Sequence, residues 1–393
     1  MNTHFKSFLT TAEEQEWLLT HDHFQVITYV AETDETHVRM NEAYVGKDVY
    51  QPFTITQKTG TIHIYINHYF SYSLDNGATW VDTASTGFDL QTGDSLQLKA
   101  TLTERQAAWH GQTDTHDIEI NDDENNTFEI SGNLSSLIDK DYYYKCDCHD
   151  RNGLTYEYMF YQMFKGHQGL VSAENLILPY NTTPGMYQEM FQDCHHLQKA
   201  PSHLPAKEIS NHAYEFMFWT CSYAEGGVTV DGLTNIPLVK THCTTGEGAY
   251  HGAFGNNELV TSLPQGMDLG TPSDARQVFA NTRITKAPKI NIISSNEGCR
   301  LMFSYCFALT DASDVHIENR GGMWNTPFSG AFEQCSLLDH FEIYGENWPE
   351  LDSTTFDGCA ASGTFTVPAN TNYNPEDYIG NGIPSGWTIV RAS

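Results

Sequence analysis

Three short clusters in this sequence carry side chains of the types that bind metal ions. Cys146-Asp147-Cys148-His149 brings two thiols and an imidazole together, but structural zinc sites space paired cysteines differently and need a second pair of ligands. His195-His196 lies beside a cysteine of a repeat, and Asn121–Asn126 offers oxygen ligands without the spaced acidic loop of calcium sites. We predict no metal ion and no cofactor, and interpret the last two clusters as solvent-exposed.

The segment Ser73–Trp80 matches the Asp-box of sialidases, in which the aspartate ties down a hairpin and the tryptophan packs beneath it. A sialidase repeats this box around a propeller and needs clustered arginines, whereas this chain has one box and arginines dispersed from Arg39 to Arg391. Asn76-Gly77 also predicts a type I′ turn, which needs positive φ at both central residues. The box is therefore expected to be structural. The predicted hairpin turn consists of Asp75, Asn76, Gly77 and Trp80.

Sequence patterns of common enzymes are missing. No G-x-S-x-G, H-E-x-x-H or P-loop pattern is present, and Gly246–Gly252 misses the dinucleotide-binding spacing by one residue and follows no convincing strand. Paired carboxylates for glycoside cleavage stay open as an alternative, because their pairing would be spatial. We predict that the protein is not an enzyme.

A repeat dominates the sequence from about residue 128 onward. Tyr187, Met190, Phe191 and Cys194 stand at positions i, i+3, i+4 and i+7, which predicts one apolar stripe on a short helix. Extended segments such as Val315-His316-Ile317 follow, so each repeat is expected to be a helical turn and a strand. Its anchoring phenylalanines are spaced by 27, 27, 36, 25, 24, 29 and 24 residues. A cysteine three residues after a phenylalanine is interpreted as a small apolar core residue. The predicted repeat core consists of Phe164, Phe191, Cys194, Leu197, Phe218, Cys221, Phe254, Phe279, Phe303, Cys306, Leu309, Phe332, Cys335, Leu338 and Phe356.

The elements before the repeats have a different texture. Thr11-Ala12-Glu13-Glu14 fits a capping box and predicts a short helix, whereas Thr61–Ile66 and Ser95–Ala100 alternate like half-buried strands. We therefore expect a multi-domain, mainly β protein with short helices. Its parts would be an N-terminal helical arm at 1–23, an antiparallel, immunoglobulin-like β-sandwich at 24–127 and an α/β solenoid of leucine-rich repeats with a C-terminal cap at 128–393.

Composition limits the classes of partner. The chain of 393 residues has 20 Lys and Arg against 50 Asp and Glu, a formal charge of -30, which disfavours nucleic acid and anionic membranes. No apolar run approaches the roughly 20 residues of a membrane-spanning helix. The nine cysteines and the N-terminal residues Met1–Leu9, which lack a signal-peptide pattern, favour synthesis in a reducing cytoplasm.

The repeats resemble a known family. The pattern Tyr-x-x-Met-Phe-x-x-Cys-x-x-Leu-x-x-Ala-Pro at Tyr187–Pro201 is similar to the BspA-type leucine-rich repeats of surface proteins in gut Bacteroidetes and their crAss-like phages. Phe128–Leu137 and Ala173–Pro179 resemble the first coil of that family, and Gly382–Ile389 resembles its closing segment. Repeats between 221 and 290 depart from the pattern. The resemblance implies adhesion or a virion surface role and implies no chemistry.

These observations lead to a main hypothesis and its alternatives. The main one is a non-enzymatic phage virion protein, made in the host cytoplasm, anchored by its N-terminal part to other virion proteins and displaying the repeats for attachment to a host glycan or protein. Exposed Tyr and Trp side chains would stack on sugars, and the assembled protein is expected to be an oligomer. The alternatives are a purely architectural capsid decoration, fibre or collar protein, and a bacterial cell-surface adhesin; a carbohydrate hydrolase ranks last.

Overall fold

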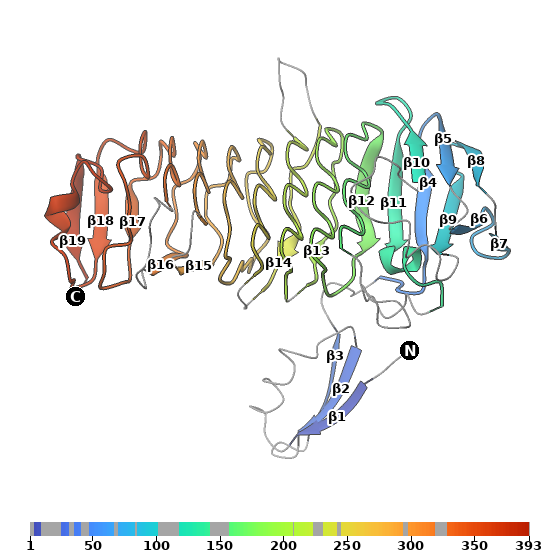
Figure 1. The fold of residues 1–393 in the computed structure, drawn as a ribbon, viewed down its shortest axis with the longest axis horizontal. Helices are drawn as coiled ribbons and strands as arrows, with labels where there is room; N and C mark the ends of the chain where they lie inside the picture. The colour runs from blue at the N-terminus through green and yellow to red at the C-terminus, as the bar shows by residue number, and fades with distance from the viewer. Residues whose placement is uncertain are drawn as a thin grey trace.

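The protein is mainly β, as the ribbon of the computed structural model shows (Figure 1). The structure describes residues 4–8, 25–30, 35–40, 47–66, 70–82, 85–100, 118–141, 157–206, 208–222, 231–241, 245–293, 298–318 and 328–392. Within these ranges the only helices are two 3-10 turns, η2 (Leu134–Leu137) and η5 (Pro375–Tyr378). None of the helices in the described ranges is long and apolar enough to cross a membrane.

A small sheet contains the first three strands that the structure describes. β1 (His4–Phe8) pairs in parallel with β2 (Gln25–Val30), and β2 pairs antiparallel with β3 (Glu35–Met40). The described part of the segment 1–23 is therefore a strand, and a helical arm is wrong for these residues. The helix expected from the capping box at residues 11–14 lies outside the described residues.

Two further sheets follow. The three-stranded sheet has the order β10 (Ile118–Asn121), β5 (Thr61–Ile66), β8 (Thr86–Gln91). The six-stranded sheet has the order β12 (Leu170–Ile177), β11 (Phe128–Asn133), β4 (Phe53–Gln57), β9 (Ser95–Ala100), β6 (Phe70–Ser73), β7 (Val81–Asp82). β5 buries Ile62, Ile64 and Ile66 on one face and exposes the residues between them, as alternation in a strand requires.

Strand β11 connects the N-terminal strands to the rest of the chain. It pairs antiparallel with β4 and in parallel with β12, so one sheet continues across residues 127 and 128. η2 follows β11 directly, and its Ser136 Oγ donates to the Leu98 carbonyl and accepts from the Phe53 N–H, both at 2.9 Å. This buried hydroxyl fastens the end of β11 to β4 and β9.

From β12 onward the chain runs as a row of stacked turns, green to red in Figure 1, which we call the turn array. Most passes contribute a short strand that pairs in parallel with a neighbouring pass, whereas the pass between β14 and β15 contributes single bridges from Asp268 to Lys240 and Lys289 instead. These strands are β13 (His203–Leu204), β14 (Leu238–Val239), β15 (Ile290–Ile293), β16 (Val315–Glu318), β17 (His340–Glu342), β18 (Gly363–Val367) and β19 (Trp387–Arg391).

The predicted helical stripes are not α-helices, and this expectation is wrong for the described passes. Around Tyr187 the N–H groups alternate in direction: Met190 N donates within its own turn to Tyr187 O at 3.1 Å, whereas Phe191 N donates to Met217 O of the next turn at 2.8 Å. Every fourth residue has positive φ, as at Glu189 (56°) and Asp193 (61°). A left-handed residue costs roughly 1–2 kcal/mol when it is not glycine, so the bonds between turns must outweigh this cost.

Candidate functional site

The eight phenylalanines that anchor the repeats form one continuous ring stack. They are Phe164, Phe191, Phe218, Phe254, Phe279, Phe303, Phe332 and Phe356, and each is 5% exposed or less. Neighbouring ring centroids lie 5.2–6.1 Å apart, with planes inclined by 3–20°. The leucines of the predicted core, Leu197, Leu309 and Leu338, are also fully buried. These residues therefore hold the turns together and are inaccessible to a ligand.

A second column of rings runs beside the first. Phe160, Tyr187, Tyr214 and Tyr250 stack at 5.7–6.2 Å with interplanar angles of 9–21°. Burial raises the pKa of the Tyr214 and Tyr250 hydroxyls well above their usual range. These tyrosines are thus kept neutral and serve as core residues.

The repeat cysteines are hydrogen-bond donors rather than simple apolar residues. Each thiol lies three residues after its phenylalanine, in what we call the cysteine slot, and donates to the phenylalanine carbonyl of the preceding turn at 2.8–3.2 Å. The residues are Cys194, Cys221, Cys306, Cys335 and Cys359. Burial raises the pKa of Cys306 to about 11 and that of Cys359 to about 12. Thiolate, the reactive form, is therefore scarce at neutral pH.

Two turns fill the cysteine slot with other donors, which the sequence reasoning missed. Asn257 is fully buried, and its Nδ2 donates to the carbonyls of Phe218 at 2.8 Å and Phe254 at 2.9 Å. Thr282 is also fully buried, and it donates at 2.9 Å to the carbonyl of Phe279, the phenylalanine of its own turn. The sequence carries a signal for this role, because Asn257 and Thr282 are polar residues at a repeat position that was interpreted as apolar. Their side chains indicate that this position favours a hydrogen-bond donor.

The Asp-box hairpin is held by its own carboxylate. Asp75 accepts from Thr79 N at 2.8 Å, from Thr79 Oγ1 at 2.6 Å and from Ser73 Oγ at 2.7 Å, and these bonds lower its pKa to about 2. Asn76 and Gly77 both have positive φ. Trp80 lies under the ammonium of Lys99, which is 4.2 Å from its ring centroid. Asp75 therefore organises the turn.

The other clusters noted in the sequence lie apart from one another. Cys146–His149 is outside the described residues. His196 Nδ1 pairs with Asp231 at 2.5 Å, and within Asn121–Asn126 the Asp123 carboxylate accepts from Asn125 N and Asn126 N in a local turn. In the parts of the chain that the structure covers, no three His, Cys, Asp or Glu side chains converge as metal ligands.

The outward side chains of the turn array are linked from one turn to the next. Glu189 accepts from Gln162 Nε2 at 2.7 Å and from Lys165 Nζ at 2.5 Å, both of the preceding turn. The carboxylate of Glu189 is only 16% exposed. Polar contacts of this kind order a surface that would otherwise consist of independent side chains.

Glu215 is the centre of a connected outward cluster. It accepts from Gln188 Nε2 of the preceding turn and bonds Nδ1 of His212 and of His251, each at 2.9 Å. Its side chain is 13% exposed. Burial alone would raise the pKa of this carboxyl, but the hydrogen bonds and charges of His251 and His212 outweigh burial and lower the pKa. Glu215 is therefore ionised at neutral pH and holds both imidazoles in place.

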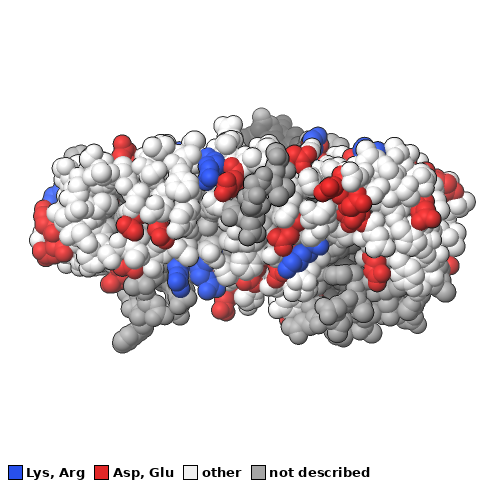
Figure 2. Space-filling model, turned by 90° about the horizontal axis from the view of Figure 1, so that it is seen from above, with Lys and Arg blue, Asp and Glu red and all other residues white. Residues whose placement is uncertain are grey.

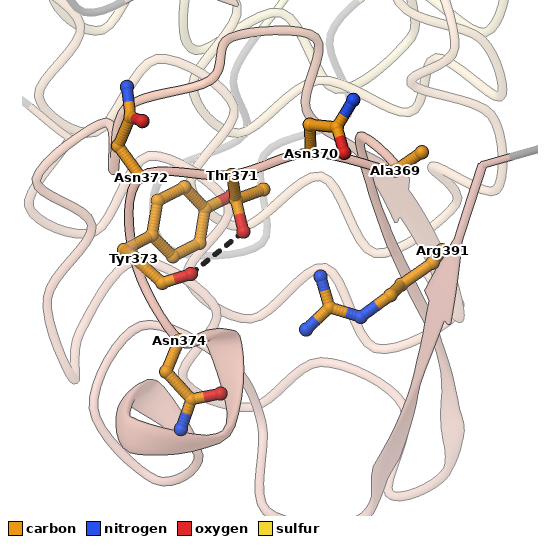
Figure 3. A pocket seen from close by; sticks show the side chains of 7 residues that line it. All are labelled: Ala369, Asn370, Thr371, Asn372, Tyr373, Asn374 and Arg391. Carbon is orange, nitrogen blue, oxygen red and sulfur yellow. Dashed lines mark hydrogen bonds between the residues drawn. The ribbon is translucent and has the colours of Figure 1, made fainter.

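An open depression of about 550 Å³ lies at the C-terminal end, between the loop 369–374 and β19 (Figure 3). Arg391 reaches toward this loop, while the carboxamides of Asn372 and Asn374 point away from the centre. Arg391 also lies 3.8 Å from Glu376. The depression is polar and could hydrogen-bond a hydroxylated ligand.

Charged side chains are spaced apart on one face of the molecule. Figure 2 shows acidic and basic groups separated by broad uncharged areas on the face it presents.

Comparison with protein-family models, curated proteins and solved structures finds no match to this chain.

Proposed function

We propose that the chain is a non-enzymatic surface protein of a phage virion that attaches the particle to its host. In this proposal residues 24–127 are an immunoglobulin-like β-sandwich, residues 128–393 are a BspA-type leucine-rich-repeat solenoid, and the N-terminal part docks on other virion proteins. The observation that carries the proposal is the ring stack, from Phe164 to Phe356, because it makes a long array whose outward side chains recur at matching positions.

Stacked turns suit attachment for a physical reason. Each turn buries its rings against its neighbours and leaves its remaining side chains outward, so a broad rigid surface is available for recognition. A rigid surface loses little entropy when it binds. The linked groups around Glu189 and Glu215 support this use, since their geometry is set before any ligand arrives.

The test is binding of the fluorescently labelled full chain to intact cells of a panel of Bacteroidetes strains. The full chain is required because β11 pairs with both β4 and β12, so division at residue 127 would separate paired strands. Saturable binding to some strains is expected. Periodate treatment of the cells would identify a glycan receptor by abolishing binding, and protease treatment would identify a protein receptor. Absence of binding to every strain would refute attachment and favour the purely architectural role.

A variant lacking residues 1–46 separates anchoring from attachment. The sheet β1–β2–β3 shares no strand with the other sheets described, so its removal should leave the turn array folded. We expect this variant to bind cells like the full chain and to be lost from assembled particles. Normal incorporation into particles would contradict anchoring through this segment.

A further inference from the structure

Two aromatic side chains on the outward face lie over the glycines of the next turn. A Cβ built on Gly252 would be 2.4 Å from Phe216 Cδ1 and 3.0 Å from Trp219 Cε3, and one built on Gly255 would be 2.4 Å from Trp219 Cζ3. Any other residue at these two positions would displace the rings. The backbone of the turn that carries Gly252 and Gly255 therefore packs directly against the rings of Phe216 and Trp219.

The two rings form a corner. Their centroids are 5.2 Å apart and their planes are inclined by 83°, and both side chains are half-buried, so part of each remains accessible. We call this pair the aromatic corner. Phe216 has φ of 51°, whereas the matching position on the next turn is Gly252. Phe216 is thus an aromatic residue at a position where the backbone favours glycine.

Polar groups border the aromatic corner. The His251 ring lies 4.5 Å from the Phe216 ring, centroid to centroid, and its Nδ1 bonds Glu215 Oε1 at 2.9 Å. The carboxylate holds Nδ1 of each imidazole, so it fixes the direction in which Nε2 of His212 and of His251 can hydrogen-bond. The side chain of His251 is 17% exposed and that of His212 is 37% exposed.

We propose that the aromatic corner is a binding site for a neutral saccharide. A pyranose has an apolar C–H face and a rim of hydroxyls, which match an aromatic surface bordered by fixed hydrogen-bonding groups. A neutral sugar is favoured over an acidic one because Glu215 is negative and the chain carries a formal charge of -30. This inference rests on the proposed function and names the ligand class of the attachment surface.

The experiment is titration of the purified full chain with four neutral hexasaccharides, built of α-glucose, β-glucose, β-xylose and α-mannose, and with hexagalacturonate as the acidic comparison. Calorimetry measures binding up to millimolar concentrations. The variants are Trp219→Ala, Trp219→Phe and, as a matched control, Phe307→Ala, which truncates another exposed aromatic of the turn array. Thermal melting of each variant reports whether it is folded.

We expect at least one neutral hexasaccharide to bind. Trp219→Ala should weaken that binding by about tenfold or more, Trp219→Phe should retain part of it, and Phe307→Ala should leave it unchanged. If Trp219→Ala does not fold, the partial loss of saccharide binding in Trp219→Phe tests the proposal instead. The proposal is overturned if no neutral hexasaccharide binds, if hexagalacturonate binds more tightly than all of them, or if both Trp219 variants bind like the wild type.

The result can be separated from the fate of the proposed function. Wild type and Trp219→Phe are compared in the cell-binding assay as well. Cell binding that is saturable but equal in the two proteins, together with no hexasaccharide binding, would leave attachment standing and reject the aromatic corner as its site.

Discussion

Replacing Asn257 by aspartate tests the interpretation of the cysteine slot most sharply. The side chain is fully buried, its Nδ2 group faces the carbonyls of Phe218, Phe254 and Gly255 at 2.8–3.0 Å, and its Oδ1 accepts from Ser222 Oγ at 3.2 Å. Asn257→Asp changes the shape of the residue very little. It replaces a donor by an ionised acceptor that faces three carbonyl oxygens.

The expected loss is large and depends on pH. An uncompensated buried charge costs about 3–5 kcal/mol, so the free energy of unfolding should fall by that amount near neutral pH. The same cost raises the folded-state pKa of the introduced carboxyl by roughly 2–4 units above its unfolded value of about 3.9. Because the folded pKa is the higher one, the variant is least impaired at low pH and loses stability as the pH rises through the folded pKa.

The assay is urea denaturation followed by circular dichroism, at about pH 7.5 and about pH 5.5, both above the sequence pI of about 4.7. Asn256→Asp is the matched control, because it adds the same charge one residue away at a half-buried position. We expect the control to change the free energy of unfolding by less than about 1 kcal/mol. The reasoning is refuted if the two variants are equally stable at the higher pH, or if acidification does not narrow the gap between them.

Three further predictions concern the turn array. The thiol of Cys306 is fully buried and that of Cys359 is partly buried, and burial raises their pKa values to about 11 and about 12. Neither should react readily with Ellman's reagent near pH 8 until urea unfolds the chain, and the free energy of unfolding should fall as the pH rises above about 8.5. Rapid labelling of Cys306 in the native protein would contradict this. Phe303→Ala should lower the free energy of unfolding by about 3–5 kcal/mol, because the ring is stacked on both sides at 5.4 and 5.6 Å. Urea denaturation measures this loss, and a loss below about 1 kcal/mol would contradict the prediction. Tyr305→Gly should raise the melting temperature, since Tyr305 has φ of 62° and is 45% exposed. The control Phe307→Gly should lower the melting temperature. A lower melting temperature for Tyr305→Gly than for Phe307→Gly would exclude backbone strain at Tyr305.

Sequence patterning located the buried side chains of each repeat but not the backbone that carries them. Over the eight residues from Tyr187 to Cys194 a helix with 3.6 residues per turn and a series of four-residue turns place the same side chains on one face. What distinguishes them is the donation from Phe191 N to Met217 O, a contact between passes that no local pattern reveals. The spacing of the phenylalanines, in contrast, is a property of the whole pass and predicts which rings are neighbours.

The candidate sites show the same division between local and non-local information. The Asn76-Gly77 turn is local and could be predicted. The aromatic corner depends on Phe216 and Trp219 meeting two glycines that are 36 residues further along the chain, so composition and spacing alone did not indicate it. The pairing of β11 with both β4 and β12 could not be predicted either, because the sequence of a strand does not determine which strands are its neighbours in a sheet.

The alternating hydrogen bonds of the turn array also decide how the molecule would respond to mechanical load. Bonds such as Phe191 N to Met217 O join consecutive passes. Because stacked units are held mainly by their neighbours, tension between the two ends should detach passes one at a time rather than all together. A pass of 24–29 residues releases roughly 80–100 Å of extended chain. A protein with this construction would lengthen in steps under tension while its undetached passes stay folded.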